Sequence, residues 1–372
     1  MFITIVAGAR PNFVKIAPII KAISNCKHKD ANICFRLVHT GQHFDKRMSA
    51  DFFDQLEIPS PDINLECGGG TQAEQTAAIM VKFEKELQEF RPDIVLVVGD
   101  VTSTMACSIT ARKLGIDTAH VEAGIRSGDW SMPEEINRVV TDSICNHFFT
   151  TSDTANKNLL ANSVSPDLVH FVGNTMIDTL YQNLHKIKKP SFWDENNIKE
   201  KKYFLVTLHR PSNVDDPKKL EFILNSINNT TSNFLVVFPV HPRTKQVLKS
   251  INFRSKNILQ VDPLAYLEFI YLIKHAKGII TDSGGITEEA TVLSIPCLTL
   301  RTSTERPETV TIGTNELVGD DYFKLDSYLG KIIKNDWKKG AIPPLWDGNS
   351  SERIINVLYN IYGKHKLNER RA

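Results

Sequence analysis

The chain has 372 residues, of which 41% are hydrophobic and 23% are charged, and its formal net charge is +1. This length is too great for one ordinary hydrophobic core, so we expect two domains with a cleft between them. The near-neutral charge gives no electrostatic reason for a nucleic acid or a membrane surface to be a partner. The composition is therefore typical of a soluble globular protein.

The six cysteines are scattered, and none belongs to a C-x-x-C pair or has a companion histidine at metal-ligand spacing. This pattern predicts neither a zinc site nor a disulfide framework, and it is typical of a cytoplasmic protein. The sequence begins directly with a strand pattern and has no apolar run long enough to span a bilayer. We therefore expect no targeting or membrane-spanning segment.

The first half of the chain alternates predicted strands with predicted helices. The strands cover residues 2–10, 35–43, 94–98, 118–121, 147–152 and 168–173. Helical apolar spacing covers residues 11–23, 44–58, 71–90, 102–114 and 175–186, and residues 59–70 are a loop by composition. The unbroken alternation predicts an α/β domain over residues 1–185, with a parallel sheet flanked by helices.

A second α/β series follows a charged, aperiodic segment, residues 186–202, which we interpret as a linker. Its predicted strands cover residues 203–210, 233–241, 257–261, 278–285 and 296–300, and its predicted helices cover residues 216–227, 265–276 and 286–294. This second domain occupies residues 203–350, and an amphipathic C-terminal helix lies within residues 351–372.

Acidic residues stand where elements of the first domain end or begin. Asp100 follows strand 94–98, Glu122 follows strand 118–121, and Glu134 opens the helix that starts at Pro133. The carboxyl ends of parallel strands border the ligand crevice of an open sheet. An acid in a first helical turn is by itself often only a partner of the helix dipole. The three acids together favour a catalytic site.

Basic residues are expected at the same edge. Arg138 lies one helical turn after Glu134 on the same face, so three carboxylates and an arginine converge on one cleft. Arg10 ends the first strand and Lys15 lies one turn along the next helix, where cations suit a phosphate. The alternative for Arg10 and Lys15 is a salt bridge to Asp100 or Glu122.

The second domain carries a strand, a glycine pair and a helix at residues 280–289, ITDSGGITEE. Gly284 and Gly285 let a ligand approach the backbone, and the N–H groups of the helix start favour an anion such as a diphosphate. The alternative is tight packing alone. The pattern is neither G-x-G-x-x-G nor a P-loop, so dinucleotide and ATP sites lose their main support. Glu288 and Glu289 either cap this helix or bind ribose hydroxyls.

Histidines and arginines end other strands of the second domain. His209 ends its first strand and His241 its second, while Arg301 and Arg306 follow strand 296–300. A positive second domain facing an acidic first domain suits a nucleotide sugar, with phosphate on one side and sugar chemistry on the other.

Nine motifs resemble those of the bacterial UDP-N-acetylglucosamine 2-epimerases, in the same order and over nearly the whole chain. They are GARPNFVKIAP, VHTGQHFD, VVGDVTST, HVEAGIRSGD, MPEEINRVVTD, TLHRPSNVDDP, PVHPRT, ITDSGGITEE and RTSTERPETV. The resemblance implies two Rossmann-like domains of the glycosyltransferase-B type, usually in a homodimer, with UDP held mainly by the second domain. It also implies that the C-terminal helix packs back on the first domain.

The resemblance assigns roles to individual residues. The positions that match the family's catalytic residues are Asp100, Glu122, Glu134 and His209. The matches to its substrate and UDP contacts are Arg10, Lys15, Ser283, Gly284, Gly285, Glu289 and Arg306, with Phe269 near the uracil. Arg138 joins these contacts from its place in the acidic cleft.

The implied reaction agrees with the residues. The C2 proton of an N-acetylhexosamine is not acidic, because C1 is an acetal rather than a carbonyl. Loss of UDP from C1 gives an oxocarbenium-like centre, from which a carboxylate can remove the C2 proton. Re-addition of UDP to the resulting 2-acetamidoglucal inverts C2. This route needs acids and bases on both faces of the ring and cations on the diphosphate, and it needs no cofactor.

The chain departs from the common motifs at several positions. Ala9 and Asn12 stand in a motif that reads GTRPE in many members, and this change resembles members acting on 2,3-diacetamido-uronic acid derivatives. Thr287 replaces a glutamine.

Some bacterial members bind a second substrate molecule as an activator. Gln42 and His241 match that activator site, whereas Asp45 and Glu74 stand where those members have glutamine and arginine.

The leading hypothesis is a non-hydrolysing epimerase that interconverts UDP-GlcNAc and UDP-ManNAc for bacterial surface polysaccharide synthesis. One alternative is a hydrolysing relative that releases ManNAc and UDP, and another is an epimerase of UDP-2,3-diacetamido-uronic acid. A glycosyltransferase of the same architecture is a more remote alternative, because it usually needs only one base and the chain offers three acids. A nucleotide-sugar binding protein without catalytic activity is also less favoured, because it would not need Asp100, Glu122 and Glu134.

Overall fold

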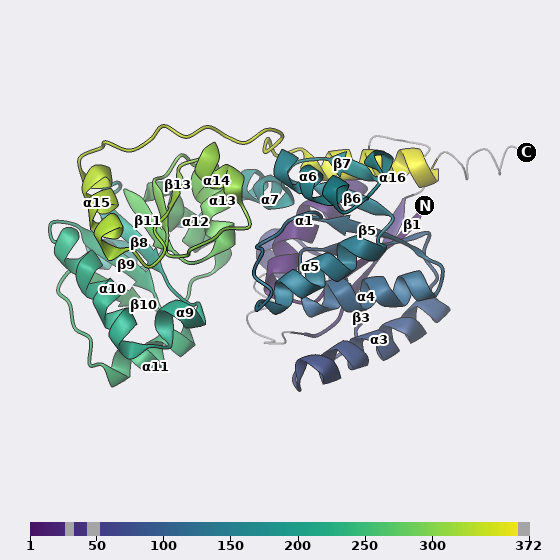
Figure 1. Ribbon diagram of the computed structural model, residues 1–372, viewed down its shortest axis with the longest axis horizontal. Coiled ribbons are helices and arrows are strands. Elements are labelled where there is room, and N and C mark those ends of the chain that lie inside the picture. Colours follow the sequence, from purple (N-terminus) through teal and green to yellow (C-terminus); the bar gives the residue numbers. More distant parts are fainter. Residues whose placement is uncertain (27–32, 43–52, 364–372) are drawn as a thin grey trace, which may run out of the picture. The chain divides into compact units, whose positions relative to one another are not determined.

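The computed structural model describes residues 1–26, 33–42 and 53–363, and it divides into two compact units (Figure 1). Unit 1 comprises Met1–Gln182 with Pro344–Ala372, and unit 2 comprises Asn183–Pro343. Within the described ranges, no helix combines the length and the apolar character that crossing a membrane requires.

Unit 1 is built on a seven-stranded parallel sheet with the order β3-β2-β1-β4-β5-β6-β7. The strands are β1 (Phe2–Ala7), β2 (Cys34–His39), β3 (Ile63–Asn64), β4 (Ile94–Val98), β5 (Asp117–Val121), β6 (His147–Thr150) and β7 (Val169–Phe171). The whole of β4 is buried because helices cover both faces of the sheet. The strand order reverses between β1 and β4, which is where ligands bind in open sheets of this kind.

Helices follow almost every strand of unit 1 (Figure 1). They are α1 (Arg10–Ser24), α3 (Gln72–Glu89), α4 (Thr102–Lys113), α5 (Pro133–Ile144), α6 (Asp153–Ala161), η1 (Pro166–Leu168), α7 (Thr175–Asn183), α16 (Ser350–Leu358) and η2 (Tyr359–Gly363). Helix α4 lies between α3 and α5, and α1 packs against α16. Part of the helix predicted at residues 44–58 lies outside the described residues.

Unit 2 has a six-stranded parallel sheet with the order β10-β9-β8-β11-β12-β13. The strands are β8 (Tyr203–Thr207), β9 (Leu235–Pro239), β10 (Ile258–Val261), β11 (Gly278–Thr281), β12 (Cys297–Thr299) and β13 (Asn315–Leu317). The helices are α8 (Phe192–Glu195), α9 (Pro211–Val214), α10 (Pro217–Thr230), α11 (Pro242–Ser250), α12 (Tyr266–His275), α13 (Gly284–Val292), α14 (Pro307–Thr311) and α15 (Tyr322–Ile333). The two Rossmann-like parallel sheets confirm the predicted fold class.

Two short strands differ from the sequence-based prediction. Strand β3 lies in the segment predicted as a loop and pairs with β2 through Val38–Ile63 and His39–Asn64. Strand β13 pairs with β12. Two or three residues are too few to show a period, so only pairing with a neighbour defines these strands.

The segment interpreted as a linker, residues 186–202, lies within unit 2 and contains α8. Trp193 of this helix is buried, and its ring packs edge-on against Tyr203 at 5.4 Å and Tyr271 at 5.2 Å. These contacts anchor the segment in the hydrophobic core of unit 2, which its charged composition did not predict.

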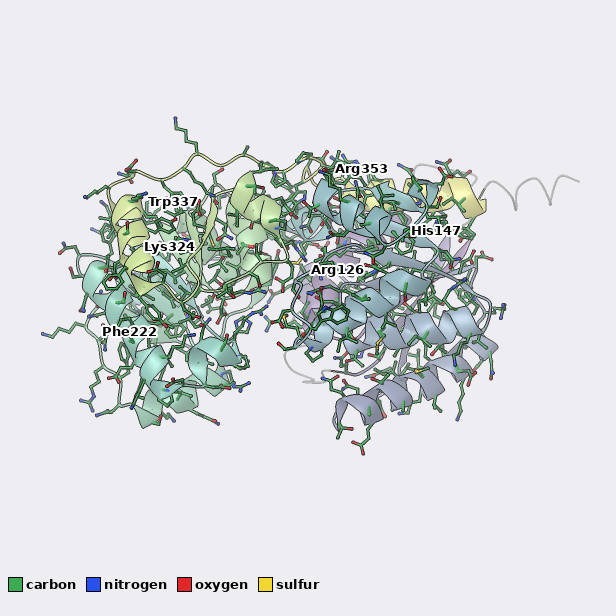
Figure 2. The ribbon with its side chains drawn as sticks, viewed as in Figure 1. Arg126, His147, Phe222, Lys324, Trp337 and Arg353 are labelled. Carbon is green, nitrogen blue, oxygen red and sulfur yellow. The ribbon has the colours of Figure 1, made fainter. Side chains whose placement is uncertain are left out.

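The C-terminal segment is anchored in unit 1. Asp178 accepts hydrogen bonds from the backbone N–H groups of Ser350 at 3.1 Å and Ser351 at 2.6 Å, at the start of α16. Arg353, labelled in Figure 2, donates to the carbonyl of Val172 at 3.0 Å. Trp346 is fully buried, and its indole N–H donates to the carbonyl of Thr151 at 2.9 Å.

We expect Trp346→Ala to destabilise unit 1 by about 3–5 kcal/mol, because it removes a large buried ring and leaves a cavity. Trp130→Ala is the matched control, because Trp130 is 65% exposed, and it should change stability by less than about 0.5 kcal/mol. Urea unfolding followed by circular dichroism measures both variants. Equal losses in the two variants would contradict the anchoring role of Trp346.

Candidate active site

Two of the predicted acids of unit 1 follow the neighbouring strands β4 and β5. Asp100 comes after Gly99, and Glu122 directly follows Val121. Glu122 has a backbone φ of 69°, which is rare for a residue with a side chain and costs about 1–2 kcal/mol. Such strain persists only where surrounding contacts fix the backbone, and it is common at functional sites.

Glu122 is 4% exposed and forms an ion pair with Lys15 of α1, which is 6% exposed. Of the two interpretations of Lys15, the structure therefore shows the salt bridge. Gly99 borders this pair: a Cβ atom there would lie 2.8 Å from the Lys15 Nζ, and the φ of Gly99 is 68°. The turn before Asp100 thus requires glycine.

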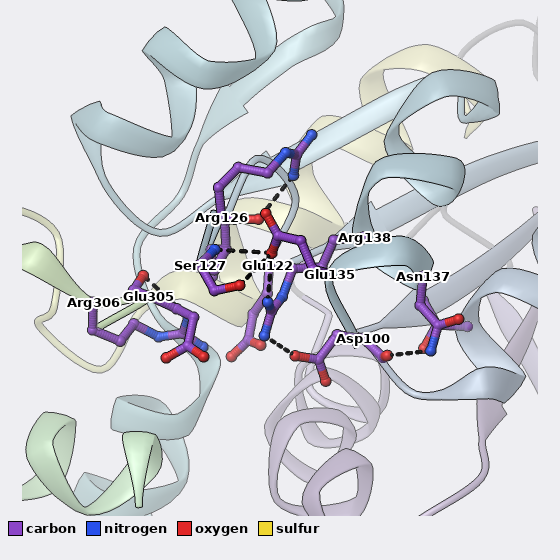
Figure 3. A network of polar contacts seen from close by, with 12 residues as sticks. Asp100, Glu122, Arg126, Ser127, Glu135, Asn137, Arg138, Glu305 and Arg306 are labelled. Carbon is purple, nitrogen blue, oxygen red and sulfur yellow. Dashed lines mark hydrogen bonds and ion pairs between the residues drawn. The ribbon is translucent and has the colours of Figure 1, made fainter. Parts of the chain in front are cut away.

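Arg138 of α5 lies between two carboxylates (Figure 3). Its guanidinium donates to Glu135 at 2.8 Å and to Asp100. The amide of Asn137 donates to the main-chain carbonyl of Asp100 at 2.8 Å. The side chain of Asp100 is therefore oriented by a buried arginine and remains 29% exposed.

The partner of Arg138 within α5 is Glu135, three residues before it, and not Glu134 as the one-turn spacing suggested. Glu135 also accepts hydrogen bonds from the backbone of Ser127 at 2.8 Å and of Gly128 at 3.1 Å. Burial alone would raise the pKa of Glu135, but these bonds and Arg138 lower it below its usual value. Glu135 thus orders the loop before α5.

Glu134 lies in the first turn of α5 and is partly buried. Across the ranges that the structure describes, no hydrogen bond or ion pair reaches its carboxylate. It differs in this respect from Asp100 and Glu122, each of which is held by a cation. The three predicted acids are therefore not equivalent.

A fourth carboxylate, Asp142 of α5, was not singled out in the sequence. It is buried and accepts from the Gly124 backbone N–H at 3.0 Å and from Arg126 at 2.6 Å. It also contacts His120 Nδ1 at 2.7 Å, and His120 Nε2 contacts the carbonyl of Gly99 at 2.8 Å. Burial alone would raise the pKa of Asp142, but His120 and Arg126 lower it below its usual value.

The start of α1 brings Arg10 and Asn12 to the end of β1. Asn12 Oδ1 accepts from the backbone N–H groups of Gly8 at 2.9 Å and Ala9 at 3.0 Å, and its amide donates to the carbonyl of Val98 at 3.1 Å. Burial lowers the pKa of Arg10 below its usual value. Asn12 therefore fixes the turn that carries Arg10.

Gln42 also lies in unit 1, and its side-chain oxygen accepts from the hydroxyl of Ser103 at 2.9 Å. Glu74 forms a capping box with Thr71 at the start of α3. Asp45 lies outside the described residues. His241, the other residue predicted for an activator site, belongs to unit 2, where its Nδ1 accepts from the Arg243 backbone N–H at 3.3 Å.

In unit 2, His209 follows β8, and its Nδ1 lies 2.9 Å from Asp282 Oδ1. The side chain of His209 is 48% exposed, whereas that of Asp282 is fully buried. Asp282 stands directly before the Ser283-Gly284-Gly285 motif, and its role was not predicted.

Ser283 is the N-cap residue of α13, and Gly284 and Gly285 are its first two residues. The Ser283 side chain makes no capping bond to the helix. A Cβ at Gly284 would stand 3.9 Å from the Arg301 guanidinium. It would also stand 4.0 Å from Glu305 Oε2, so the start of α13 lies beside an arginine–glutamate ion pair. The feature that suits an anion there is the set of backbone N–H groups at the start of the helix.

The arginines of this region are paired with buried glutamates. Arg301 makes two hydrogen bonds of 2.7 Å to Glu305. Burial alone would raise the pKa of Glu305, but Arg301 lowers it to about 2. Arg306 pairs with Glu288 (both Arg306 and Glu305 appear in Figure 3). Glu288, predicted as a helix cap or a ribose contact, is thus the partner of Arg306.

Glu289 and Phe269 complete the predicted contacts in unit 2. Glu289 is 4% exposed, and burial, with the neighbouring charge of Glu288, raises its pKa to about 8. Phe269 lies on α12 and is partly buried.

Comparison with known proteins identifies a matching family and similar structures. A family model described as UDP-N-acetylglucosamine 2-epimerase matches residues 25–359. A UDP-N-acetylglucosamine 2-epimerase of Methanocaldococcus jannaschii is 41% identical over 98% of this chain and 100% of its own length. Its crystal structure with UDP-GlcNAc and UDP has a TM-score of 0.85 and covers 97% of this chain and 100% of its own.

Two further similar proteins carry other names. A UDP-2,3-diacetamido-2,3-dideoxy-D-glucuronate 2-epimerase of Pseudomonas aeruginosa is 38% identical over 96% of this chain and 99% of its own length. The lipopolysaccharide galactosyltransferase WaaB is 13% identical, with a TM-score of 0.58 over 97% of this chain and 99% of its own, which shows the fold alone. The fold is of the glycosyltransferase-B type, and the family match and the identities show that the chain belongs to the UDP-N-acetylglucosamine 2-epimerase family.

Proposed function

We propose that this protein inverts C2 of a UDP-N-acetylhexosamine, interconverting UDP-GlcNAc and UDP-ManNAc without net hydrolysis. The observation that carries the proposal is the set of three carboxylates in unit 1, Asp100, Glu122 and Glu134, of which two are oriented by buried cations. A binding protein without chemistry has no use for this set. Its relatives named as UDP-N-acetylglucosamine 2-epimerases span nearly the whole chain.

The proposed reaction has two halves. In the first, the bond between C1 and the diphosphate oxygen breaks, its electron pair leaves with UDP, and a carboxylate takes the C2 proton, so that a C1–C2 double bond forms. In the second, a proton adds to C2 from the opposite face and UDP returns to C1. No atom is gained or lost, and no redox group takes part.

The acids suit proton transfer on two faces of a sugar ring. Asp100 and Glu122 follow different strands and are held by different cations, Arg138 and Lys15. Such an ion pair holds a carboxylate in a fixed orientation when the substrate binds. This fixed orientation contributes much of the rate gain in general acid–base catalysis. We assign the diphosphate to the start of α13, where Gly284 and Gly285 offer backbone N–H groups. Ser283 offers its hydroxyl instead, because its backbone N–H already donates to the Thr281 hydroxyl at 3.0 Å. We assign the ribose to Glu289.

A second candidate substrate is a UDP-2,3-diacetamido-uronic acid. The Pseudomonas aeruginosa relative that carries this name is 38% identical to the chain. Asn12 also favours it, because this buried residue is neutral where the common GTRPE motif has a glutamate. Near Arg10, the loss of one negative charge would favour a sugar that carries a carboxylate. In other respects the proposed chemistry is unchanged.

Proton NMR of UDP-GlcNAc incubated with the protein in D2O tests the proposal. Deuterium at C2 with accumulating UDP-ManNAc is the expected result. Deuterated ManNAc with released UDP would instead show the hydrolysing reaction. Absence of exchange with both UDP-GlcNAc and the diacetamido-uronic acid nucleotide would overturn the epimerase proposal.

We expect Asp100→Asn to slow C2 exchange by at least about 10²-fold, because the amide keeps the bond from Arg138 but cannot take a proton. UDP affinity, measured by calorimetry, should stay within about threefold of wild type. Asp153→Asn is the control, because this acid pairs with Lys157 on the surface with its side chain 70% exposed. Normal exchange in Asp100→Asn would remove Asp100 from the mechanism.

Glu289 predicts a pH dependence of UDP binding. An ionised Glu289 accepts from ribose hydroxyls through both oxygens and more strongly than the protonated acid, so UDP should bind more tightly to the ionised form. Its pKa of about 8 keeps Glu289 mostly protonated at pH 7. UDP affinity should therefore rise about fivefold to tenfold between pH 7 and 8.5, where the terminal phosphate of UDP is already ionised. The same rise in Glu289→Gln would show that another group is responsible.

Asn12→Glu should lower kcat/KM for the diacetamido-uronic acid nucleotide about tenfold more than for UDP-GlcNAc, because it adds a negative charge near Arg10. Asn12→Gln serves as the control, because glutamine has the same side-chain length as glutamate but carries no charge. Equal losses for both substrates in Asn12→Glu would contradict a role of this residue in substrate choice.

A further inference from the structure

Asp282 is surrounded by donors from the segment that follows β8. Its Oδ2 accepts from the backbone N–H of His209 at 3.1 Å and of Arg210 at 2.9 Å, and the Asn213 amide approaches it at 3.3 Å. Its Oδ1 lies 2.9 Å from His209 Nδ1. One buried carboxylate therefore holds both the main chain and the ring of His209.

The protonation of the His209 ring follows from this geometry. An ionised carboxylate has only acceptor atoms, so the bond to Asp282 forms only if Nδ1 carries hydrogen. Burial alone would raise the pKa of Asp282, but His209 and the backbone donors lower it below its usual value, so the carboxylate stays ionised. Neutral His209 then has its lone pair on Nε2, and the ring is 48% exposed.

His241, at the end of the neighbouring strand β9, provides a contrast within the same unit. Its Nδ1 accepts from the backbone N–H of Arg243 at 3.3 Å, so in the neutral ring the proton lies on Nε2. Burial and the charges of His209 and Arg243 lower the pKa of His241, which favours this neutral form. The two histidines thus hold their protons on opposite nitrogens.

We propose that Asp282 is a positioning residue that fixes His209 in the Nδ1–H form and leaves Nε2 to exchange a proton with the bound nucleotide sugar. The part concerning the nucleotide sugar rests on the function proposed above. The arrangement follows the general logic of a carboxylate that orients a histidine base, in which the wrong tautomer is inactive even when the geometry is kept. It distinguishes His209 as a proton acceptor from His241 as a donor.

The tautomers are measured directly by long-range ¹H–¹⁵N NMR of protein labelled with ¹⁵N-histidine at about pH 8.5. His209→Gln and His241→Gln assign the two signals among the eleven histidines. In the wild-type protein we expect an unprotonated Nε2 for His209 and an unprotonated Nδ1 for His241. A protonated Nε2 on neutral His209 would overturn the proposal, and this result needs no variant at position 282.

Asp282→Asn then tests the consequence. An asparagine oxygen can still accept from the backbone, but its amide donates to Nδ1 and moves the ring proton to Nε2. We expect this tautomer change and a loss of C2 exchange of about 10²–10⁴-fold, with UDP affinity within about threefold of wild type. Asp326→Asn is the matched control, because Asp326 is exposed. Among the described residues, its side chain accepts hydrogen bonds only from the hydroxyls of Ser226 and Thr230.

The outcomes separate the two proposals. An unchanged tautomer in a folded Asp282→Asn variant, or a changed tautomer with full exchange activity, would contradict the positioning role. The expected tautomers together with no C2 exchange in the wild-type protein would leave the role of Asp282 in the ring intact and overturn the proposed function instead.

Discussion

The arrangement of the acidic residues in unit 1 depends on the contacts of the Asp142 carboxylate. This carboxylate binds the backbone of Gly124, two residues after Glu122, and through His120 it reaches the carbonyl of Gly99, the residue before Asp100. Asp142 belongs to α5, the helix that also carries Glu134 and Arg138. One buried group therefore sets the positions of both acid-bearing turns relative to that helix. Asp142 also explains how Glu122 keeps its unfavourable φ of 69°, because its bond to the Gly124 backbone N–H fixes the turn that contains Glu122. Buried charges of this kind are tolerated only when every partner is present.

Each unit contains a buried aspartate beside a histidine, and the two pairs have different consequences. His120 is fully buried, and both of its ring nitrogens are occupied by acceptors, Asp142 and the Gly99 carbonyl. Such a ring has no nitrogen left for a substrate, so its role is to hold the backbone. His209 is half exposed and has one nitrogen bound to Asp282. The same pair of side chains thus makes a structural link in one unit and, in our proposal, a proton-transfer group in the other. Exposure of the second nitrogen is what distinguishes them.

The sequence predicted the parallel sheets well, because buried strands such as β4 are continuous apolar runs. It also predicted the acids at strand ends, since Asp100 and Glu122 directly follow such runs. It did not separate Glu134 from Glu135 as the partner of Arg138, because spacings of three and four residues both place side chains on one helical face. Asp142 and Asp282 were missed for a different reason. Each is a single polar residue inside a regular element or a glycine motif, and its importance comes from donors that are distant in the chain, such as His209 for Asp282.

The arginines of unit 2 are held in ion pairs, which limits their direct contribution to anion binding. Arg301 and Arg306 looked in the sequence like a positive surface for a diphosphate, yet each is paired with a buried glutamate, Glu305 or Glu288. Much of their charge is therefore already compensated before any ligand binds. What these pairs provide is rigidity. The bidentate Arg301–Glu305 pair holds both side chains in one geometry, and Arg306 Nε donates to Glu288 Oε1. In our proposal the remaining attraction for a diphosphate comes largely from the backbone N–H groups at Gly284 and Gly285, since that of Ser283 already donates to Thr281. In this interpretation, the ion pairs fix the loop and α13, and the start of that helix receives the anion.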